Sequence, residues 1–263
     1  MDFLILIAME KFKFALVRKP TESMIAGISS AKLGKPDFAK ALEQHQAYCE
    51  AMKECGLDII EIESLTQFPD AVFVEDTAIV TERFAVISKP GHENRKGEEK
   101  SVANKLIEYR PLEFIESPGL LDGGDIMRVG DHFYIGLSDR TNIEGARQLT
   151  SHLKKYDYSA SMVEIGEMLH LKTGINYVGS QKMVMVDGLH SMKEFEKFEK
   201  IIIPENESYA ANCVLVNDYL LIAKGFKTAK DKFLKKAGFK IIELDMSEFR
   251  KLDGGLSCLS LRF

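Results

Sequence analysis

A unit of two strands, a helix and a third strand recurs along the chain with a period of about 45 residues. A polar or thiol residue stands near the head of each unit, at Asp76, Asp125, His170, Cys213 and Cys258. Periods of this length are typical of propellers, in which the units pack around a closed ring. Each unit here also contains a helix, which an ordinary four-stranded blade lacks. The repeat therefore predicts a closed α/β architecture.

The elements of each unit follow from the hydrophobic periodicity and from the turn residues between the apolar runs. The expected helices span residues 36–53, 101–109, 143–155, 192–198 and 229–237. The expected strands span residues 12–17, 59–62, 72–80, 84–88, 111–115, 124–129, 133–135, 160–165, 175–178, 182–186, 200–203, 213–216, 219–223 and 240–244, followed by a C-terminal apolar strand that carries Cys258.

Both ends of the chain are incomplete units. The last unit has a leading strand with no helix after it, whereas the N-terminal unit has a strand, a long loop, a helix and a strand. A ring of five units, in which the C-terminal strand completes the N-terminal unit, accounts for both ends. We expect one domain over residues 1–263, with residues 1–11 as an N-terminal extension and Met9 as an alternative start. A doubly wound open sheet is the alternative, disfavoured because hairpins are so frequent.

Charge and cysteine usage restrict the function. The net charge is -5, and the basic residues are scattered rather than striped, so nothing indicates a nucleic-acid partner. The four cysteines have no Cys-x-x-Cys spacing, which favours free thiols in a reducing compartment. The apolar run at residues 3–8 is far shorter than the ~20 residues that a membrane span needs. We therefore expect a cytoplasmic protein without a membrane partner.

Closure of the ring would bring the heads of the units to one central axis. The groups gathered there would be Asp76, either Asp122 or Asp125, His170 and Cys258. A thiol nucleophile, a histidine acid/base and an orienting carboxylate form a working catalytic set. Taken alone, however, a cysteine among leucines is more often a small buried hydrophobe, and Asp122 to Asp125 reads as a glycine-rich turn.

The additional carboxylates indicate the substrate. Asp70, Glu75 and Asp76 lie within seven residues of one another. Carboxylates near a thiol raise its pKa, so their presence requires another cation to bind. A planar guanidinium held by paired carboxylates is the natural candidate.

The chain also resembles a known family, the dimethylarginine dimethylaminohydrolases of the guanidine-modifying (pentein) superfamily. The resemblance covers roughly residues 12–263 and rests on ordered motifs: FPD at 68–70, FVED at 73–76, LDGGD at 121–125, GLSDRTN at 136–142, LHLKTG at 169–174, AANC at 210–213 and GGLSC at 254–258. It implies the five-bladed α/β-propeller of that superfamily, in agreement with the repeat.

The resemblance implies that Cys258 is the nucleophile, that His170 is the general acid/base and that Asp122 orients the histidine. The implied reaction converts Nω-methylated arginine to citrulline and a methylamine through a covalent thiouronium adduct. No metal or organic cofactor is needed, although zinc could occupy a Cys/His site as an inhibitor. The substrate-binding residues implied are Asp70, Glu75 and Asp76 for the guanidinium, Arg95 and Arg140 for the α-carboxylate, Ile28 in a lid, and the backbone of Leu252 for the α-amino group.

One departure bears on specificity, and three functions stay open. Relatives that deiminate arginine tend to have a carboxylate two residues after the histidine, where this chain has Lys172. Its loss fits a substrate whose methylated nitrogen cannot donate every hydrogen bond. The first alternative is another enzyme of the superfamily: an arginine deiminase, another guanidine hydrolase or an amidinotransferase. The second alternative is a non-catalytic propeller protein, which would need neither His170 nor Cys258. We keep a homodimer as an open expectation.

Overall fold

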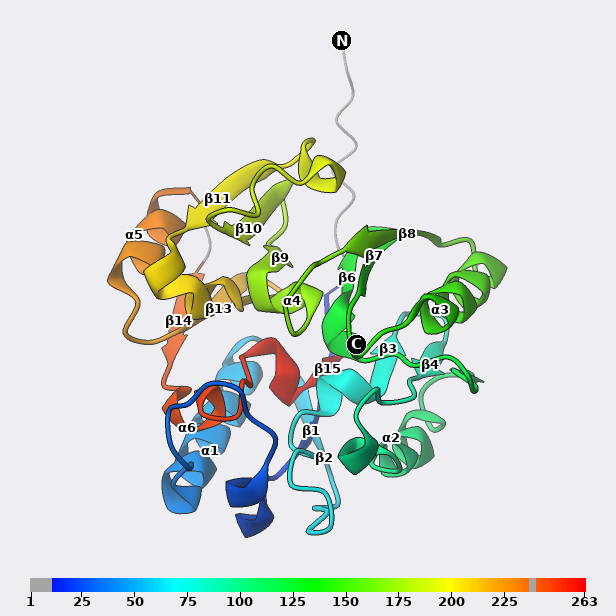
Figure 1. Ribbon diagram of the computed structural model, residues 1–263. Coiled ribbons are helices and arrows are strands. Elements are labelled where there is room, and N and C mark those ends of the chain that lie inside the picture. Colours follow the sequence, from blue (N-terminus) through cyan, green and yellow to red (C-terminus); the bar gives the residue numbers. More distant parts are fainter. Residues whose placement is uncertain (1–10, 237–239) are drawn as a thin grey trace.

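The computed structural model describes residues 11–236 and 240–263, and five three-stranded sheets surround a central axis (Figure 1). In chain order from the N-terminal unit, the sheets are β15(Leu261–Arg262)-β1(Phe14–Arg18)-β2(Asp58–Ile62), β3(Ala78–Val80)-β4(Ala85–Ile87)-β5(Leu112–Phe114), β6(Ile126–Val129)-β7(His132–Leu137)-β8(Ser159–Glu164), β9(Ile175–Tyr177)-β10(Lys182–Val186)-β11(Glu199–Ile203) and β12(Val214–Val216)-β13(Tyr219–Ala223)-β14(Lys240–Leu244).

Every sheet has the same topology. The first strand pairs antiparallel with the middle strand, and the middle strand pairs parallel with the third. A parallel pair needs a crossover connection, which a helix supplies in four units: α1(Phe38–Glu54), α2(Glu99–Leu106), α3(Ile143–Lys155) and α5(Lys227–Lys236). These helices lie on the outside of the ring (Figure 1). The prediction of a five-bladed α/β-propeller is confirmed.

The C-terminal strand closes the ring as expected. Leu261 of β15 pairs with Leu16 of β1, so the two ends of the chain share one sheet. Buried apolar residues form five clusters, and each cluster joins two neighbouring units, including the last unit and the first. Packing between units rather than within them therefore holds the ring together.

The local sequence explains where the main helices begin. The carboxylate of Asp37 accepts a hydrogen bond from the Lys40 amide at 3.0 Å and caps α1. The side chain of Asn142 likewise accepts from the Gly145 amide at 2.8 Å and caps α3. Such caps satisfy amide donors that the first helical turn leaves free.

Several expected elements differ from the structure. The strand expected over residues 124–129 begins at Ile126, after the 3-10 turn η4(Gly123–Asp125). The strand predicted over residues 72–80 begins only at Ala78, because Val74–Thr77 form a 3-10 helix, η2, whose last hydroxyl donates to the Val74 carbonyl at 2.7 Å. The helix predicted over residues 192–198 shrinks to a 3-10 turn, η5(Lys193–Phe195). Only twelve residues separate β10 from β11 there, and Gly188 takes a positive φ of 91°. That length leaves no room for a full crossover helix.

The expected N-terminal extension, residues 1–11, lies almost wholly outside the described residues, as does the alternative start at Met9. Among the helices that the structure describes, none combines the length and the apolar character needed to cross a bilayer.

Candidate active site

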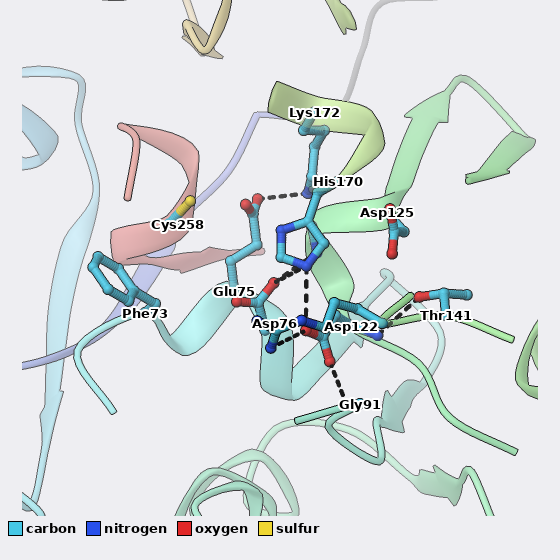
Figure 2. Close-up of polar contacts among 12 residues, drawn as sticks. Phe73, Glu75, Asp76, Gly91, Asp122, Asp125, Thr141, His170, Lys172 and Cys258 are labelled. Atoms are coloured by element: carbon cyan, nitrogen blue, oxygen red, sulfur yellow. Dashed lines mark hydrogen bonds and ion pairs between the residues drawn. The ribbon is translucent and has the colours of Figure 1, made fainter. Parts of the chain in front are cut away.

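Short helical turns, rather than strands, deliver the side chains to the axis. They immediately precede the first strand of a unit, and they are η2, η4(Gly123–Asp125), α4(Leu171–Gly174) and η7(Ser257–Leu259). Cys258 thus lies on a 3-10 turn just before the C-terminal strand, not on the strand as expected. Figure 2 shows these turns converging on one site.

His170 lies between two carboxylates. Its Nε2 is 3.2 Å from Oδ2 of Asp122 and 4.0 Å from Oδ1 of Asp76. Asp122 is fully buried, and its Oδ1 accepts a hydrogen bond from the Gly91 amide at 2.9 Å. The Asp122 amide donates to the Thr141 hydroxyl at 3.1 Å. Asp122 is therefore fixed from both sides with one oxygen directed at the imidazole (Figure 2).

Gly124 makes this approach of the histidine sterically feasible. A β-carbon at this position would lie 2.6 Å from Nδ1 of His170 and 2.9 Å from Oδ1 of Asp76. The Gly124 amide also donates to Oδ1 of Asp76 at 2.9 Å. The glycine pair in the LDGGD motif is thus required by the close packing of the site.

The carboxylates keep His170 protonated. Burial alone would lower the pKa of His170, but Asp76, Asp122 and Asp125 together raise it to about 9. In turn, His170 and Arg95 outweigh the burial of Asp76 and hold the pKa of that carboxyl at about 2. The site therefore carries an imidazolium at neutral pH, the form that can donate a proton.

Asp125 stands behind the site. Its carboxylate accepts hydrogen bonds from the Leu171 amide at 3.0 Å and from the Ser138 hydroxyl at 2.7 Å. It therefore holds the backbone next to His170, while Asp122 makes the contact with the imidazole.

Arg95 is held tightly by its neighbours. Its Nη1 donates to Oδ2 of Asp76 at 2.5 Å, and its Nη2 donates to the Phe73 carbonyl at 2.9 Å. Its Nε donates to Oε1 of Glu98 at 3.0 Å, and the same oxygen also binds Nη2. Four of its five N–H groups are therefore occupied, and one is left for a ligand.

Cys258 is a neutral thiol in this environment. Its sulfur accepts a hydrogen bond from the Gly255 amide at 3.3 Å. Burial, together with the charges of Glu75 and Asp76, raises the pKa of Cys258 to about 12. Its side chain is half-buried, whereas Cys49, Cys55 and Cys213 are buried in the core. Cys258 is thus the one thiol of the described residues that opens on the site.

Glu75 is engaged by protein groups. Its two oxygens accept hydrogen bonds from Lys172 Nζ at 2.6 Å and from the Ser257 hydroxyl at 2.6 Å, and Arg262 Nη2 lies 3.2 Å away. The carboxylate therefore ties η2 to α4 through Lys172 (Figure 2) and to η7 through Ser257. A guanidinium ligand would have to compete with these partners for Glu75.

Two cavities meet at the thiol and the imidazole. The smaller, of about 160 Å³, is lined by most of the predicted residues: Ile28, Asp70, Asp76, Arg95, Arg140, His170, Leu252 and Cys258. The larger, of about 980 Å³, is lined by Glu75, Arg140, His170, Lys172, Asn212 and Cys258, among others. Asp122 lies behind His170 and lines neither. The structure thus brings every predicted site residue to one region.

A loop lines the smaller cavity through Ile28, Ser29 and Ser30, and we call residues 27–33 the lid loop. The Ile28 amide donates to both oxygens of Asp70, at 3.1 and 3.2 Å. The amide and the hydroxyl of Ser30 both donate to Oδ2 of Asp253, at 2.6 and 3.0 Å. Asp253 follows Leu252 on the segment that leads to Cys258. The bonds of Ser30 therefore attach the lid loop to the segment that carries Cys258, and the bonds of Ile28 attach it to Asp70.

Two residues near the site, Glu98 and Asp253, were not predicted from the sequence. Glu98 lies in a charged run, residues 93–100, that reads as a solvated loop, and only its i+3 spacing from Arg95 hints at a pair. Asp253 stands in a Leu-Asp-Gly-Gly sequence typical of a turn, with a positive φ of 58°. The sequence around Asp253 does not predict its bond to the lid loop.

Carboxylate and imidazole ligand atoms of Asp76, Asp122 and His170 lie within 4.8 Å of one another, a spacing that suits one metal ion. Each of the two carboxylates is already bonded, Asp76 to Arg95 and Gly124 and Asp122 to Gly91. We therefore assign the three residues to a hydrogen-bond network.

Comparison with known proteins now identifies the family. A sequence model described as "N,N dimethylarginine dimethylhydrolase, eukaryotic" matches residues 30–260. An N(G),N(G)-dimethylarginine dimethylaminohydrolase of Pseudomonas aeruginosa is 46% identical over 96% of this chain and 100% of its own length. A protein of the same name from Streptomyces coelicolor is 32% identical, over 95% of this chain and 96% of its own.

Solved structures agree. The Pseudomonas aeruginosa enzyme, as a cysteine-to-serine variant complexed with citrulline, superposes with a TM-score of 0.94 over 96% of this chain and 100% of its own. The N-terminal domain of ArgZ, a cyanobacterial arginine dihydrolase, matches with a TM-score of 0.85 but only 22% identity, and so shares the fold. With the propeller, the site and these matches in agreement, the chain belongs to the dimethylarginine dimethylaminohydrolase family.

Proposed function

We propose that this chain hydrolyses Nω-methylated arginine to citrulline and methylamine or dimethylamine, with Cys258 as the nucleophile. The main support for the proposal is the smaller cavity, of about 160 Å³, which presents a thiol, a protonated histidine, two carboxylates and two arginines to one ligand. That set is complementary to an amino acid with a guanidinium at its far end. The relatives from Pseudomonas aeruginosa and Streptomyces coelicolor described above carry the corresponding activity in their names.

The substrate binds with its two ends in different surroundings. Asp76 and Asp70 hold the guanidinium side, where Asp76 retains one oxygen directed at His170. Arg140 and the remaining N–H of Arg95 bind the α-carboxylate. The backbone of Leu252 accepts from the α-amino group, and Ile28 covers the ligand from the lid loop.

The thiol loses its proton only when the substrate is present. In the free protein the pKa of Cys258 is about 12, because burial and nearby carboxylates disfavour the thiolate. A guanidinium bound against the sulfur reverses this balance, since an opposite charge within ~4–6 Å favours the ionised form. Substrate binding and thiolate formation are therefore one coupled event, in which the thiol proton passes to solvent.

The chemistry proceeds in two halves. The sulfur of Cys258 attacks the guanidinium carbon, His170 donates its proton to the methylated nitrogen, and the C–N bond breaks to release the amine. A thiouronium adduct on Cys258 remains. Neutral His170 then takes a proton from water, and the hydroxide adds to the same carbon. The C–S bond breaks as the proton of the added hydroxyl passes to the sulfur, which gives citrulline, the free thiol and protonated His170. Asp122 accepts from Nε2 throughout, which leaves Nδ1 for these transfers.

Arginine deimination is the competing reaction. The fold is common to both activities, since an arginine dihydrolase has the same fold. One contact favours the methylated substrate: Lys172 occupies Glu75 at 2.6 Å, which reduces the acceptors available to the nitrogen that departs. A methylated nitrogen needs fewer acceptors than an unsubstituted one.

The test incubates the protein separately with asymmetric dimethylarginine, monomethylarginine and arginine, and measures citrulline. We expect turnover of the methylated substrates. Cys258→Ser should abolish it, whereas Cys213→Ser, a change at the equivalent position of the preceding unit, should retain it. Turnover of arginine alone would refute the proposed substrate, and no turnover with any guanidine would favour the non-catalytic alternative.

A further inference from the structure

Glu98 is a buried carboxylate that touches the site only through Arg95. It is 0% exposed and lines neither of the two cavities at the thiol. One of its oxygens, Oε1, binds both Nε and Nη2 of Arg95, and its other oxygen has no partner among the described residues. Its backbone carbonyl accepts from Arg18 Nη2 at 3.2 Å. A buried carboxylate costs stability unless it is paired, so the pairing with Arg95 explains its presence.

The contacts form a chain that ends at the imidazole. Glu98 holds Nε and Nη2 of Arg95, Arg95 holds Oδ2 of Asp76 at 2.5 Å, and the other oxygen of Asp76 lies 4.0 Å from His170 Nε2. We infer that Glu98 is a positioning residue, which sets the orientation of Arg95 and through it the orientation of Asp76.

The geometry of the guanidinium explains why this orientation needs Glu98. The guanidinium is planar, so fixing Nε and Nη2 on one edge fixes the direction of Nη1 on the other. Nη1 both binds Asp76 and carries the one N–H that is left for a ligand. The Phe73 carbonyl, 2.9 Å from Nη2, is a single neutral acceptor and cannot define the plane alone.

Charge is the second part of the role. The charged groups of this region are Arg18, Arg95 and Arg140, the carboxylates Asp70, Asp76, Glu98, Asp122 and Asp125, and His170. Burial raises the pKa of Glu98, whereas Arg95 and Arg18 favour its ionised form. The ionised carboxylate balances Arg95, so that Asp76 keeps its full effect on His170. Removal of the Glu98 charge would therefore lower the pKa of His170.

The experiment compares Glu98→Gln and Glu98→Ala with the wild type. Gln keeps an acceptor for Arg95 and removes the charge, whereas Ala removes both. Glu93→Gln is the matched control, because Glu93 lies on the same segment but is paired with Lys96 at the surface. The first readout is the imidazole NMR titration of His170 without substrate, with its signal assigned from a His170→Asn variant. The second is kcat and KM for asymmetric dimethylarginine across pH.

We expect the pKa of His170 to fall by roughly half to one unit in both Glu98 variants. We expect kcat/KM to fall on the order of tenfold for Gln and a hundredfold for Ala, because Ala also releases the plane of Arg95. Glu93→Gln should match the wild type in both readouts.

The kinetic readout depends on the proposed function, but the NMR readout does not, so the two ideas can fail separately. If the wild type turns over no guanidine while Glu98→Gln lowers the pKa of His170, the proposed function fails and the positioning role stands. Folded variants with a wild-type titration and wild-type kcat/KM would overturn the role. Failure of both variants to fold would assign Glu98 to stability alone and would overturn it too.

Discussion

Asp122→Asn offers a sharp test of how the imidazole is kept protonated. Asp122 is fully buried, and its Oδ2 lies 3.2 Å from His170 Nε2. Two unit charges at this separation interact by roughly 5 kcal/mol at an effective dielectric constant of about 20. Asparagine is nearly the same size, so the change removes charge with little change of volume. Gly91 and His170 contact different oxygens of Asp122, so the single carbonyl oxygen of asparagine can replace only one of these two acceptors.

The loss should appear as a shift of the His170 pKa. Asp76 and Asp125 remain in the variant and still raise the pKa of His170. We therefore take the interaction energy of roughly 5 kcal/mol as an upper bound. We expect the pKa of His170 to fall by about 1–3 units from its value of about 9. A two-unit fall would leave His170 about one-tenth protonated at pH 8, and activity there would drop about tenfold from protonation alone. At pH 6 the same variant would lose far less activity from this cause.

The assay is citrulline formation from asymmetric dimethylarginine between pH 5 and pH 10, as kcat/KM. The basic limb of the profile should move to lower pH in Asp122→Asn, and Thr141→Val, which removes only the hydroxyl that the Asp122 amide contacts, should move it less. A basic limb that stays in place in Asp122→Asn would refute the assignment of His170 as the general acid held by this carboxylate.

Two further predictions concern packing around the site, and a third concerns closure of the ring. Gly124→Ala should fold but lose at least a hundredfold in kcat, because the new methyl group would collide with His170 and Asp76; wild-type activity would contradict the close approach. Asp253→Asn should raise KM severalfold and speed amide hydrogen exchange in residues 27–33, since the latch to Ser30 weakens; unchanged exchange would refute the latch. Deletion of residues 261–263 should lower the free energy of unfolding in urea by about 3–6 kcal/mol, from two buried apolar side chains; an unchanged midpoint would contradict ring closure.

The sequence pattern predicted the architecture because the same physical pattern is repeated. Each unit has to bury one face against the next, so its apolar positions recur with the period of the unit. Ring closure followed from the two incomplete ends, and the pairing of Leu261 with Leu16 confirms it. The end of each element was harder to place, because alternating apolar residues in η2 read as strand although they form a 3-10 turn.

The site was predictable only where the motif itself carried the chemistry. Cys258, His170 and Asp122 stand in motifs and converge on one site as expected, but their individual roles stay proposals. Asp253 was missed because its contact joins two segments that are distant in the sequence. Glu98 was missed because it stands in a run of charged residues, although its partner Arg95 is only three residues away. Hydrogen bonds of that kind leave no periodic signal, so only coordinates show them.

The proposed mechanism requires Cys258 to form a covalent adduct with methylated arginine during turnover. The most direct measurement mixes the protein with asymmetric dimethylarginine, quenches it in acid within the first turnovers, and determines the intact mass and the modified peptide. We predict a mass increase equal to dimethylarginine less dimethylamine, located at Cys258 and absent in Cys258→Ser. An adduct on Cys49, Cys55 or Cys213, or citrulline formation by Cys258→Ser at the wild-type rate, would show that Cys258 is not the nucleophile.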